Sequence, residues 1–336
     1  MKKGLIFLLI LVLVSVAITG CKSEPATETE QNEAEQQEET VSEQTSWNPE
    51  KEIKCIVPFA PGGGSDILTR TIMKYIDLPV DMVAVNVEGG AGLIGAQETA
   101  NSKADGYTIL AQNPMNLIAQ GLTGNNNLWE ELTMISFVVD DWTVVSTNTQ
   151  TGWKSVEDFV SYAKEHPEEV KWGITGSGIT MADSIRAMEG LDIDCTIVPY
   201  EGGSDTRSAL LGNHIQIEVA TSSDIRSYVE SGDVVPLFVI APNRCPFLED
   251  VPTLIDLGVN VDSGAPRAYF APPGLGEDEL EYLEGKLEEV CQNEEFVKAC
   301  EDLGFVVQFV GSEEGTALMK KWYDANLPIF EEYGIK

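Results

Sequence analysis

Short apolar runs and segments of helical periodicity alternate along most of the chain after residue 50. The apolar runs are rich in Val and Ile, which predicts buried strands. Many of these runs are followed by a segment whose apolar residues recur every three or four positions, which predicts a helix. Because the strand and helix signals recur on both sides of Val144, the sequence predicts an α/β protein with two lobes.

The expected elements extend over the whole chain beyond residue 50. We expect strands at 53–57, 83–87, 108–111, 134–139, 143–146, 170–174, 195–198, 215–220, 234–241 and 305–310. We expect helices at 67–77, 96–100, 155–166, 182–188, 206–211, 224–230, from 278 onward with a break at 292–294, and at 313–330. The alternation assigns residues 50–143 and 242–336 to lobe 1 and residues 144–241 to lobe 2.

Small residues mark three of the expected strand-to-helix turns, at 61–66, 175–181 and 199–205. A helix N-terminus offers unpaired N–H groups and a positive dipole end, which suit an anion, and glycine lets a ligand approach the backbone closely. On these residues alone, tight structural turns are an equal alternative. Gln112 and Asn113 follow the strand at 108–111, where ligand contacts are common in parallel sheets.

The chain of 336 residues carries a net charge of −34, which argues against a nucleic-acid partner. An anion site must therefore be local and built from backbone dipoles and a few donors. Neither His166 nor His214 stands in a metal-ligand arrangement, and we expect no metal and no cofactor. Cys291 and Cys300 could form a disulfide in an exported protein, but we expect free buried thiols.

The N-terminal segment has the pattern of a bacterial lipoprotein signal. Lys2 and Lys3 precede the apolar run 5–16, and Ile18-Thr-Gly-Cys21 places small residues before a cysteine. We expect residues 1–20 to be the signal peptide and Cys21 to carry lipid; a plain secretory signal or a membrane anchor is the alternative. The polar, Glu-rich segment 21–49 is expected to be a disordered tether.

Six motifs occur in order over the mature chain. They are Val57-Pro-Phe-Ala-Pro-Gly-Gly-Gly-Ser-Asp66, Ala104-Asp-Gly-Tyr-Thr108, Val198-Pro-Tyr-Glu-Gly-Gly203, Leu210-Leu-Gly212, Asp250-Val-Pro-Thr253 and Ala271-Pro-Pro-Gly274. From about Glu52 to its end, the chain resembles the tripartite tricarboxylate transporter substrate-binding receptors, also called the Bug or TctC family.

The resemblance implies a two-lobed periplasmic-binding-protein fold, of the Venus flytrap, type II-like class, with a ligand cleft between the lobes. It implies a monomeric receptor, anchored at Cys21 on the extracytoplasmic face of a bacterial cell membrane. Such a receptor captures a small organic acid and delivers it to a transporter with one large and one small integral subunit. Binding is non-covalent, with closure of the lobes.

The resemblance also implies that the turns at 61–66 and 175–178 hold a carboxylate from opposite lobes. Asp66 cannot attract a carboxylate, so we expect it to cap a helix or orient a bridging water. The residues expected to line the ligand site are Phe59, Pro61, Gly62, Gly63, Gly64, Ser65, Asp66, Gln112, Asn113, Thr175, Gly176, Ser177, Gly178, Tyr200, Gly202, Thr221 and Arg267.

Three places differ from the commonest family pattern and bear on selectivity. Ile179-Thr-Met-Ala182 stands where relatives often carry a His, and Ala220-Thr221 stands where they often carry Asp-Asn. Arg267 can pair with a second ligand carboxylate or with a structural acid such as Asp140. We expect selectivity to depend on Gln112, Asn113, Ile179, Thr180, Thr221 and Arg267.

Two other classes of function are compatible with parts of the sequence. The first is a sensor module that presents its ligand to a membrane signalling kinase, which the sequence does not separate from a transport receptor. The second is an enzyme such as a hydrolase that uses Ser177 in Gly176-Ser-Gly178. No His is placed to activate this serine, and no Gly-Lys-Ser/Thr motif supports a nucleotide loop. We therefore expect that the protein is not an enzyme.

Overall fold

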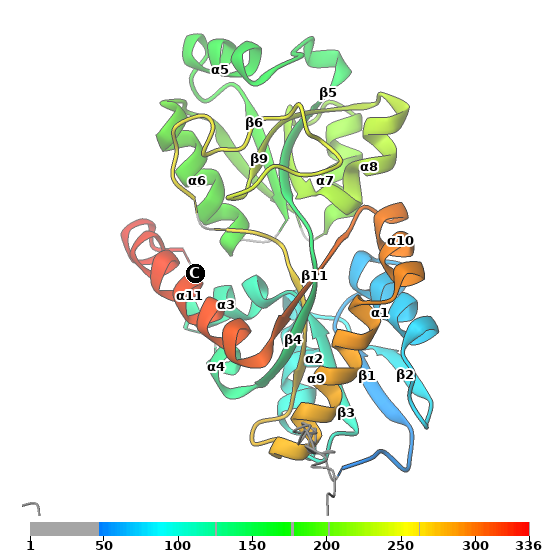
Figure 1. Ribbon diagram of the computed structural model, residues 1–336. Helices are drawn as coiled ribbons and strands as arrows, with labels where there is room; N and C mark the ends of the chain where they lie inside the picture. Colours follow the sequence, from blue (N-terminus) through cyan, green and yellow to red (C-terminus); the bar gives the residue numbers. More distant parts are fainter. Residues whose placement is uncertain (1–46, 125, 176–177, 201, 262, 336) are drawn as a thin grey trace, which may run out of the picture. The chain divides into compact units, whose positions relative to one another are not determined.

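The computed structural model describes residues 47–124, 126–175, 178–200, 202–261 and 263–335, which form two sheets with helices packed against them (Figure 1). The first sheet contains β1 (Ile53–Val57), β2 (Met82–Asn86), β3 (Thr108–Gln112), β4 (Thr133–Asp140), β10 (Arg267–Ala271) and β11 (Val306–Gly311). The second contains β5 (Thr143–Asn148), β6 (Lys171–Thr175), β7 (Thr196–Tyr200), β8 (Ile217–Thr221) and β9 (Val234–Ile240).

Helices follow most of the strands, as the alternating pattern predicts. In the part of the chain built on the first sheet they are α1 (Gly64–Tyr75), α2 (Leu93–Ala100), α3 (Pro114–Leu122), α4 (Leu128–Glu131), α9 (Glu277–Cys291), α10 (Glu294–Asp302) and α11 (Ser312–Tyr333). In the part built on the second they are α5 (Val156–Glu165), α6 (Ile179–Leu191), α7 (Gly203–Leu211) and α8 (Ser222–Ser231). Short 3-10 turns lie at η1 (Gly90–Gly92) and η2 (Thr149–Thr151). The predicted α/β class with two lobes is confirmed.

The strand order explains the uninterrupted apolar runs. The first sheet is ordered β11-β4-β10-β3-β1-β2, with β1 parallel to both β2 and β3. Cys55 of β1 packs into the core cluster that holds Leu68 of α1, whereas Ile56 packs into the cluster that holds Ala96 of α2 and Leu117 of α3. Because helices cover both faces, β1 is apolar at every position except Lys54, rather than at every second position.

Antiparallel strands complete both sheets. In the first sheet, β10 is antiparallel to β3 and β4, and β11 is antiparallel to β4. The second sheet is ordered β7-β6-β8-β5-β9, and β5 is antiparallel to both of its neighbours. The chain passes from one sheet to the other directly between β4 and β5, and again between β9 and β10. We refer to the region of these two crossovers as the hinge.

The segment 242–261 lies on the second sheet, although the sequence analysis assigned it to lobe 1. Thr253 forms an isolated bridge with Val239 of β9, and Leu254 and Val261 belong to the core cluster of the second sheet. Their burial against lobe 2 was not visible in the sequence because the segment has no regular period. We propose that the second lobe boundary lies between Val261 and Arg267.

Several predicted boundaries and elements differ from the structure. The helix α1 begins at Gly64 and not at Ile67, so the glycine turn provides its first residues. The analysis missed α3, whose start carries Asn113 as N-cap and Pro114 at the first helical position. It also missed β10, which is only five residues long and lies between two strands of the sheet. The helix break at 292–294 is confirmed by the end of α9 and the start of α10.

The predicted signal peptide, the predicted lipidation site Cys21 and most of the predicted tether fall on residues 1–46, which lie outside the described residues. The predicted tether ran to residue 49, but Trp47 packs edge-on against Tyr107 and Tyr282, with ring centroids 5.5 and 5.2 Å apart. This aromatic packing makes Trp47 part of the folded unit. In the described ranges, no helix has the length and hydrophobicity needed to cross a membrane.

All five cysteines of the described ranges are free and buried. Cys291 and Cys300 therefore stand as separate thiols, as predicted. Burial raises the pKa of each to about 12. A thiol with so high a pKa stays protonated at neutral pH and is inert as a nucleophile.

Candidate functional site

The glycine turn before α1 leaves the start of this helix without a side-chain cap. Gly62 has a φ of 81°, in the left-handed region that glycine adopts without strain. Gly63 is the N-cap residue and provides no side chain to bond the first N–H groups of α1. Pro61, Gly62 and Gly63 are exposed, and Ser65 and Asp66 are buried. The first turn of α1 therefore has donors available for an acceptor from outside the helix.

Asp66 fixes the shape of this turn. Its carboxylate accepts the Gly62 N–H at 2.8 Å, the Asn86 amide at 3.1 Å and the Arg70 guanidinium at 3.0 Å. Burial opposes ionisation, but the hydrogen bonds from Arg70, Gly62 and Asn86 outweigh it and lower the pKa of Asp66. Asp66 is thus an ionised residue that positions the glycine turn, and its oxygens accept hydrogen bonds from other groups of the protein.

Asn86 is a positioning residue that the sequence analysis missed. Its amide donates both to Asp66 and to the Phe59 carbonyl, at 2.9 Å for the latter, so it ties β2 to the start of the glycine turn. Asn86 is the last residue of β2. Its position at the carboxyl end of a parallel strand is the signal that led us to Gln112 and could have identified Asn86 too.

Gln112 provides an unused donor beside the turn. Its side chain is 1% exposed, its Oε1 accepts the Asn113 N–H at 2.9 Å, and its Nε2 has no hydrogen-bond partner among the described residues. A β-carbon built on Gly92 would lie 2.3 Å from this Nε2 and 3.3 Å from the Phe59 ring. Phe59, Gly92 and Gln112 therefore meet, and only glycine at 92 leaves the amide room. An unpaired buried donor is costly unless an acceptor binds it.

Asn113 has a structural role that the resemblance did not imply. Its Oδ1 accepts the Met115 N–H at 2.8 Å and caps α3. The same helix meets the other lobe at Gly178, the N-cap of α6, where a β-carbon would lie 2.6 Å from Ala119 Cβ. Gly178, at the start of α6, therefore lies directly against α3. Gly176 and Ser177, the centre of this second turn, lie outside the described residues.

The remaining turns of the second lobe are linked by hydroxyl groups. Thr175 ends β6, and its Oγ1 lies 3.2 Å from Thr206 Oγ1. Thr206 in turn donates to the carbonyl of Gly202, the N-cap of α7, at 3.1 Å. Tyr200 ends β7 and packs against the small core cluster beside α7. The structure thus groups Thr175, Tyr200 and Gly202 at the ends of adjacent strands.

Asp141, in the first crossover, occupies the N-terminus of α8. Its Oδ1 accepts the Ser222 hydroxyl at 2.8 Å and the Ser223 N–H at 3.1 Å, and its Oδ2 accepts the Ser223 hydroxyl at 2.6 Å. This helix end therefore already holds an anion from the protein itself. Thr221, the predicted ligand residue here, is the N-cap residue and lies 3.1 Å from Ser223 through their hydroxyl oxygens.

Arg267 pairs with Asp141 and not with Asp140, the acid named in the sequence analysis. The distance from Nη2 to Asp141 Oδ2 is 2.9 Å, and the Arg267 Nε is buried without a partner in the described part of the chain. A β-carbon built on Gly64 would lie 3.5 Å from Arg267 Nη2 and 3.9 Å from Ser223 Oγ. The guanidinium therefore lies between the starts of α1 and α8, and its Nε–H group has no hydrogen-bond acceptor among the described residues.

The candidate site thus consists of three groups of neighbouring residues: Gly64 with Arg267, Phe59 and Gln112 on either side of Gly92, and Thr175 with the α7 turn. The sequence analysis missed Asn86, Asp141 and Ser223, which orient the predicted residues. The ligand-lining roles of all predicted residues stay predictions. A separate cavity at the hinge is lined by none of the predicted ligand residues, although Asp141 contributes to its wall.

Three comparisons with known proteins agree. The family model described as "Tripartite tricarboxylate transporter family receptor" matches residues 72–335. Protein BugT of Bordetella pertussis is 27% identical over 261 residues, covering 75% of this chain and 79% of BugT. The structure of the periplasmic binding protein BugD has a TM-score of 0.74 and 23% identity, covering 86% of this chain and 99% of BugD. MatC from Rhodopseudomonas palustris with bound malate has a TM-score of 0.69 and 21% identity, covering 84% of this chain and 99% of MatC.

Proposed function

The chain belongs to the tripartite tricarboxylate transporter receptors, a family of solute-binding proteins and not of enzymes, and from this premise we propose that it binds a small organic carboxylate between its two lobes. The family resemblance read from the six motifs and the periplasmic-binding-protein fold are thereby confirmed. The observation that carries the proposal is the position of Arg267 beside the uncapped N-terminus of α1.

The chemistry of this position favours a carboxylate. The N–H groups of the first turn of α1 carry partial positive charge, and one side of the Arg267 guanidinium is unused. The protein as a whole has a net charge of −34, so an anion needs this local arrangement of donors. Gln112 Nε2 offers one more donor that lacks a partner among described residues. The bound malate of MatC, a protein of the same fold, is the same class of ligand.

The two glycine turns are proposed to hold the ligand from opposite lobes. The first turn is fixed by Asp66 and Asn86, which hold Gly62 and the Phe59 carbonyl. The second begins at Thr175 and ends at Gly178, which touches Ala119 of α3. Because closure places both turns against one anion, the ligand stabilises the closed arrangement of the lobes. Ser177 is the proposed contact from the second turn.

The proposal extends to the cellular role. We place the receptor on the extracytoplasmic face of a bacterial cell membrane, anchored by lipid on Cys21, as a monomer that delivers its ligand to a transporter with one large and one small integral subunit. The lipoprotein pattern of residues 1–21 supports the anchor, and membership of the receptor family supports the transporter. A ligand-presenting sensor module uses the same site and differs only in its membrane partner.

A thermal-shift screen of the purified protein against a library of small carboxylates tests the ligand class. A ligand that binds only the folded protein raises the melting temperature by mass action. We expect at least one carboxylate to do so, and we expect Ser177→Trp to abolish the rise. If amides or alcohols of matched shape raise the melting temperature as much as their acids do, the carboxylate proposal fails.

A further inference from the structure

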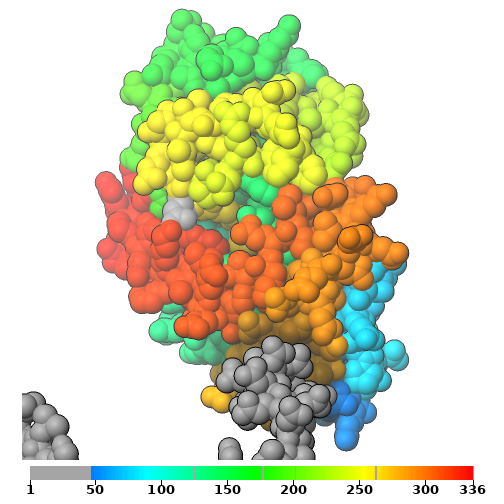
Figure 2. Space-filling view, viewed as in Figure 1, coloured from blue at the N-terminus to red at the C-terminus, as the bar shows by residue number. Residues whose placement is uncertain are grey.

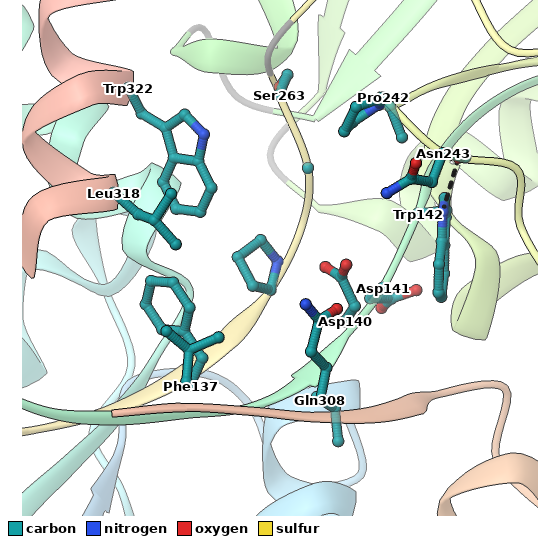
Figure 3. A pocket seen from close by; sticks show the side chains of 15 residues that line it. Phe137, Asp140, Asp141, Trp142, Pro242, Asn243, Ser263, Gln308, Leu318 and Trp322 are labelled. Atoms are coloured by element: carbon teal, nitrogen blue, oxygen red, sulfur yellow. Dashed lines mark hydrogen bonds between the residues drawn. The ribbon is translucent and has the colours of Figure 1, made fainter. Parts of the chain in front are cut away.

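The hinge encloses a cavity that belongs to neither proposed turn (Figure 3). Its volume is about 100 Å3, enough for several water molecules or a ligand of a few non-hydrogen atoms. Both crossovers contribute to it, through Asp140 to Trp142 on one side and Ala241 to Pro266 on the other, together with β11 and α11. In Figure 2 the surface is hollowed between the segment that follows β9, in yellow, and α11, in red.

The walls of this cavity are apolar and aromatic. Phe137 of β4 and Trp322 of α11 stack with ring centroids 5.7 Å apart and an interplanar angle of 12°. Trp142 closes another wall, where its indole N–H donates to the Asn243 carbonyl at 3.1 Å (Figure 3). Leu318 and Pro266 complete the lining. Such a surface attracts apolar groups and, through the ring faces, cations.

One carboxylate, that of Asp140, is aimed into the cavity (Figure 3). Among the described residues, no Lys, Arg or His nitrogen lies within 4.0 Å of it, because Arg267 is engaged by the neighbouring Asp141. Burial, and secondarily the charge of Asp141, raise the pKa of Asp140 to about 6. At neutral pH the group is therefore mostly ionised, and its partly buried charge has no counter-ion within this distance among the described residues.

Three polar side chains line the cavity together with this carboxylate. Asn243 and Gln308 are exposed, and their amide groups lie near Asp140 at the open side of the cavity (Figure 3). Ser263 is buried, and its hydroxyl group lies at the opposite side. Ser263 donates to Asp183 at 2.6 Å, so it is already engaged. The amide oxygens of Asn243 and Gln308 are acceptors for a donor that enters from solvent.

We propose that this hinge cavity is a second binding site, distinct from the carboxylate site, for a small organic cation of the alkylammonium type. The ammonium group bonds the Asp140 carboxylate and the amide oxygens of Asn243 and Gln308. The alkyl chain contacts Phe137, Leu318 and Trp322. The paired charges of Asp141 and Arg267 cancel, so the site carries a single negative charge. A metal ion is a poor occupant because only one carboxylate is available among the described residues.

The cavity size sets the probe. Propylammonium has four non-hydrogen atoms, and 1-propanol and propionate have nearly the same shape with no charge or the opposite charge. We would titrate each into the full protein by isothermal calorimetry at neutral pH, in 0.3 M salt. Salt at roughly this concentration screens the long-range attraction of an acidic protein for any cation but not a contact inside a cavity.

Two variants separate the site from the overall charge. Asp140→Asn removes the carboxylate in the cavity, whereas Asp302→Asn removes an equal charge from the exposed end of α10. A third variant, Leu318→Trp, fills the cavity from α11. We expect saturable 1:1 binding of propylammonium, about tenfold or more weaker in Asp140→Asn, lost in Leu318→Trp and unchanged in Asp302→Asn.

The alternatives to a cation site give different results. Equal binding of 1-propanol would mean that the cavity is only an apolar hollow, and it would overturn the proposal. If Asp302→Asn and Asp140→Asn weaken propylammonium binding equally, the cation is attracted by the net charge of the protein alone, and the proposal is overturned. Absence of saturable propylammonium binding to the unchanged protein would also overturn it.

Discussion

The Arg267 guanidinium donates to the Asp141 carboxylate across 2.9 Å, and this buried pair connects the two lobes. Arg267 lies in β10 of the first sheet, and Asp141 lies in the crossover between the sheets. The other bonds of Asp141 go to Ser222 and Ser223, which begin α8 of the second lobe. One carboxylate thus sets the position of the arginine beside α1 and of the helix α8 opposite it.

Arg267→Ala is expected to destabilise the fold and to weaken carboxylate binding. The side chains of Arg267 and Asp141 are 12% and 0% exposed, so removing the arginine leaves a buried charge unpaired, which costs about 3 kcal/mol or more. Urea unfolding measures this loss. As a matched control, Lys320→Ala breaks an exposed pair with Asp324 and should cost less than about 1 kcal/mol. Equal losses in the two variants would mean that the buried pair has no special role.

Gln112→Leu is expected to lower carboxylate affinity at a modest cost in stability, about 1 kcal/mol. The substitution removes the buried Nε2 donor, which has no partner among the described residues, but it also removes the Oε1 acceptor of the Asn113 N–H. If this donor bonds the ligand, its loss costs about tenfold in affinity, measured by calorimetry with the best carboxylate of the screen. Gln97→Leu, on the exposed surface of α2, is the control. An unchanged affinity in Gln112→Leu would remove this residue from the site.

Gly178→Ala is expected to interfere with the contact between the lobes. The new methyl group would lie 2.6 Å from Ala119 Cβ, so the start of α6 must move away from α3. A weaker carboxylate affinity should follow, because the second turn moves with it. Gly203→Ala is the matched control, since a β-carbon there meets nothing within 4 Å. If both variants bind with the parent affinity, the Gly178 contact does not position the second turn.

Asp140→Asn is expected to be more stable than the parent protein above pH 6. A carboxyl whose pKa rises from 3.8 to about 6 on folding binds its proton more tightly in the folded state. Its contribution to stability therefore falls as the pH rises through this range and is constant above it, a difference on the order of 3 kcal/mol. The charged groups around it are Asp141 on the same crossover and Arg267 on β10.

Urea unfolding of the parent and Asp140→Asn at pH 4 and at pH 7.5 measures this difference. The two proteins should be nearly equally stable at pH 4, and the variant should be the more stable at pH 7.5. If Asp140→Asn is less stable than the parent at pH 7.5, protein contacts stabilise the ionised Asp140 carboxylate, and its ionisation does not destabilise the fold.

The sequence predicted the strands and helices well where a periodic pattern covers a full element. The strand at 53–57 and the helix break at 292–294 have clear signals, because burial on both faces makes four of the five strand residues apolar and Asn293 caps the next helix. The missed strand β10 is short, and its place between β3 and β4 depends on pairing with distant segments. Local patterns carry no information on such pairing.

The site was predicted in outline and not in its supporting contacts. The uncapped glycine turn before α1 follows from its sequence alone. The partner of Arg267 does not, because adjacent acids at 140 and 141 look alike in sequence and point in different directions in the structure: Asp141 toward α8 and Asp140 into the hinge cavity. Neighbours in a strand face opposite sides, and only the three-dimensional packing decides which side holds the arginine.

Native mass spectrometry of the protein, purified without denaturation from the cells that produce it, tests the central claim most directly. Receptors of this kind retain ligand when the lobes are closed, and the mass of the released molecule identifies it. The account predicts a 1:1 complex with a small molecule that carries at least one carboxylate and competes with added carboxylates. A retained solute without a carboxylate, bound at the same site and displaced by no organic acid, would contradict it.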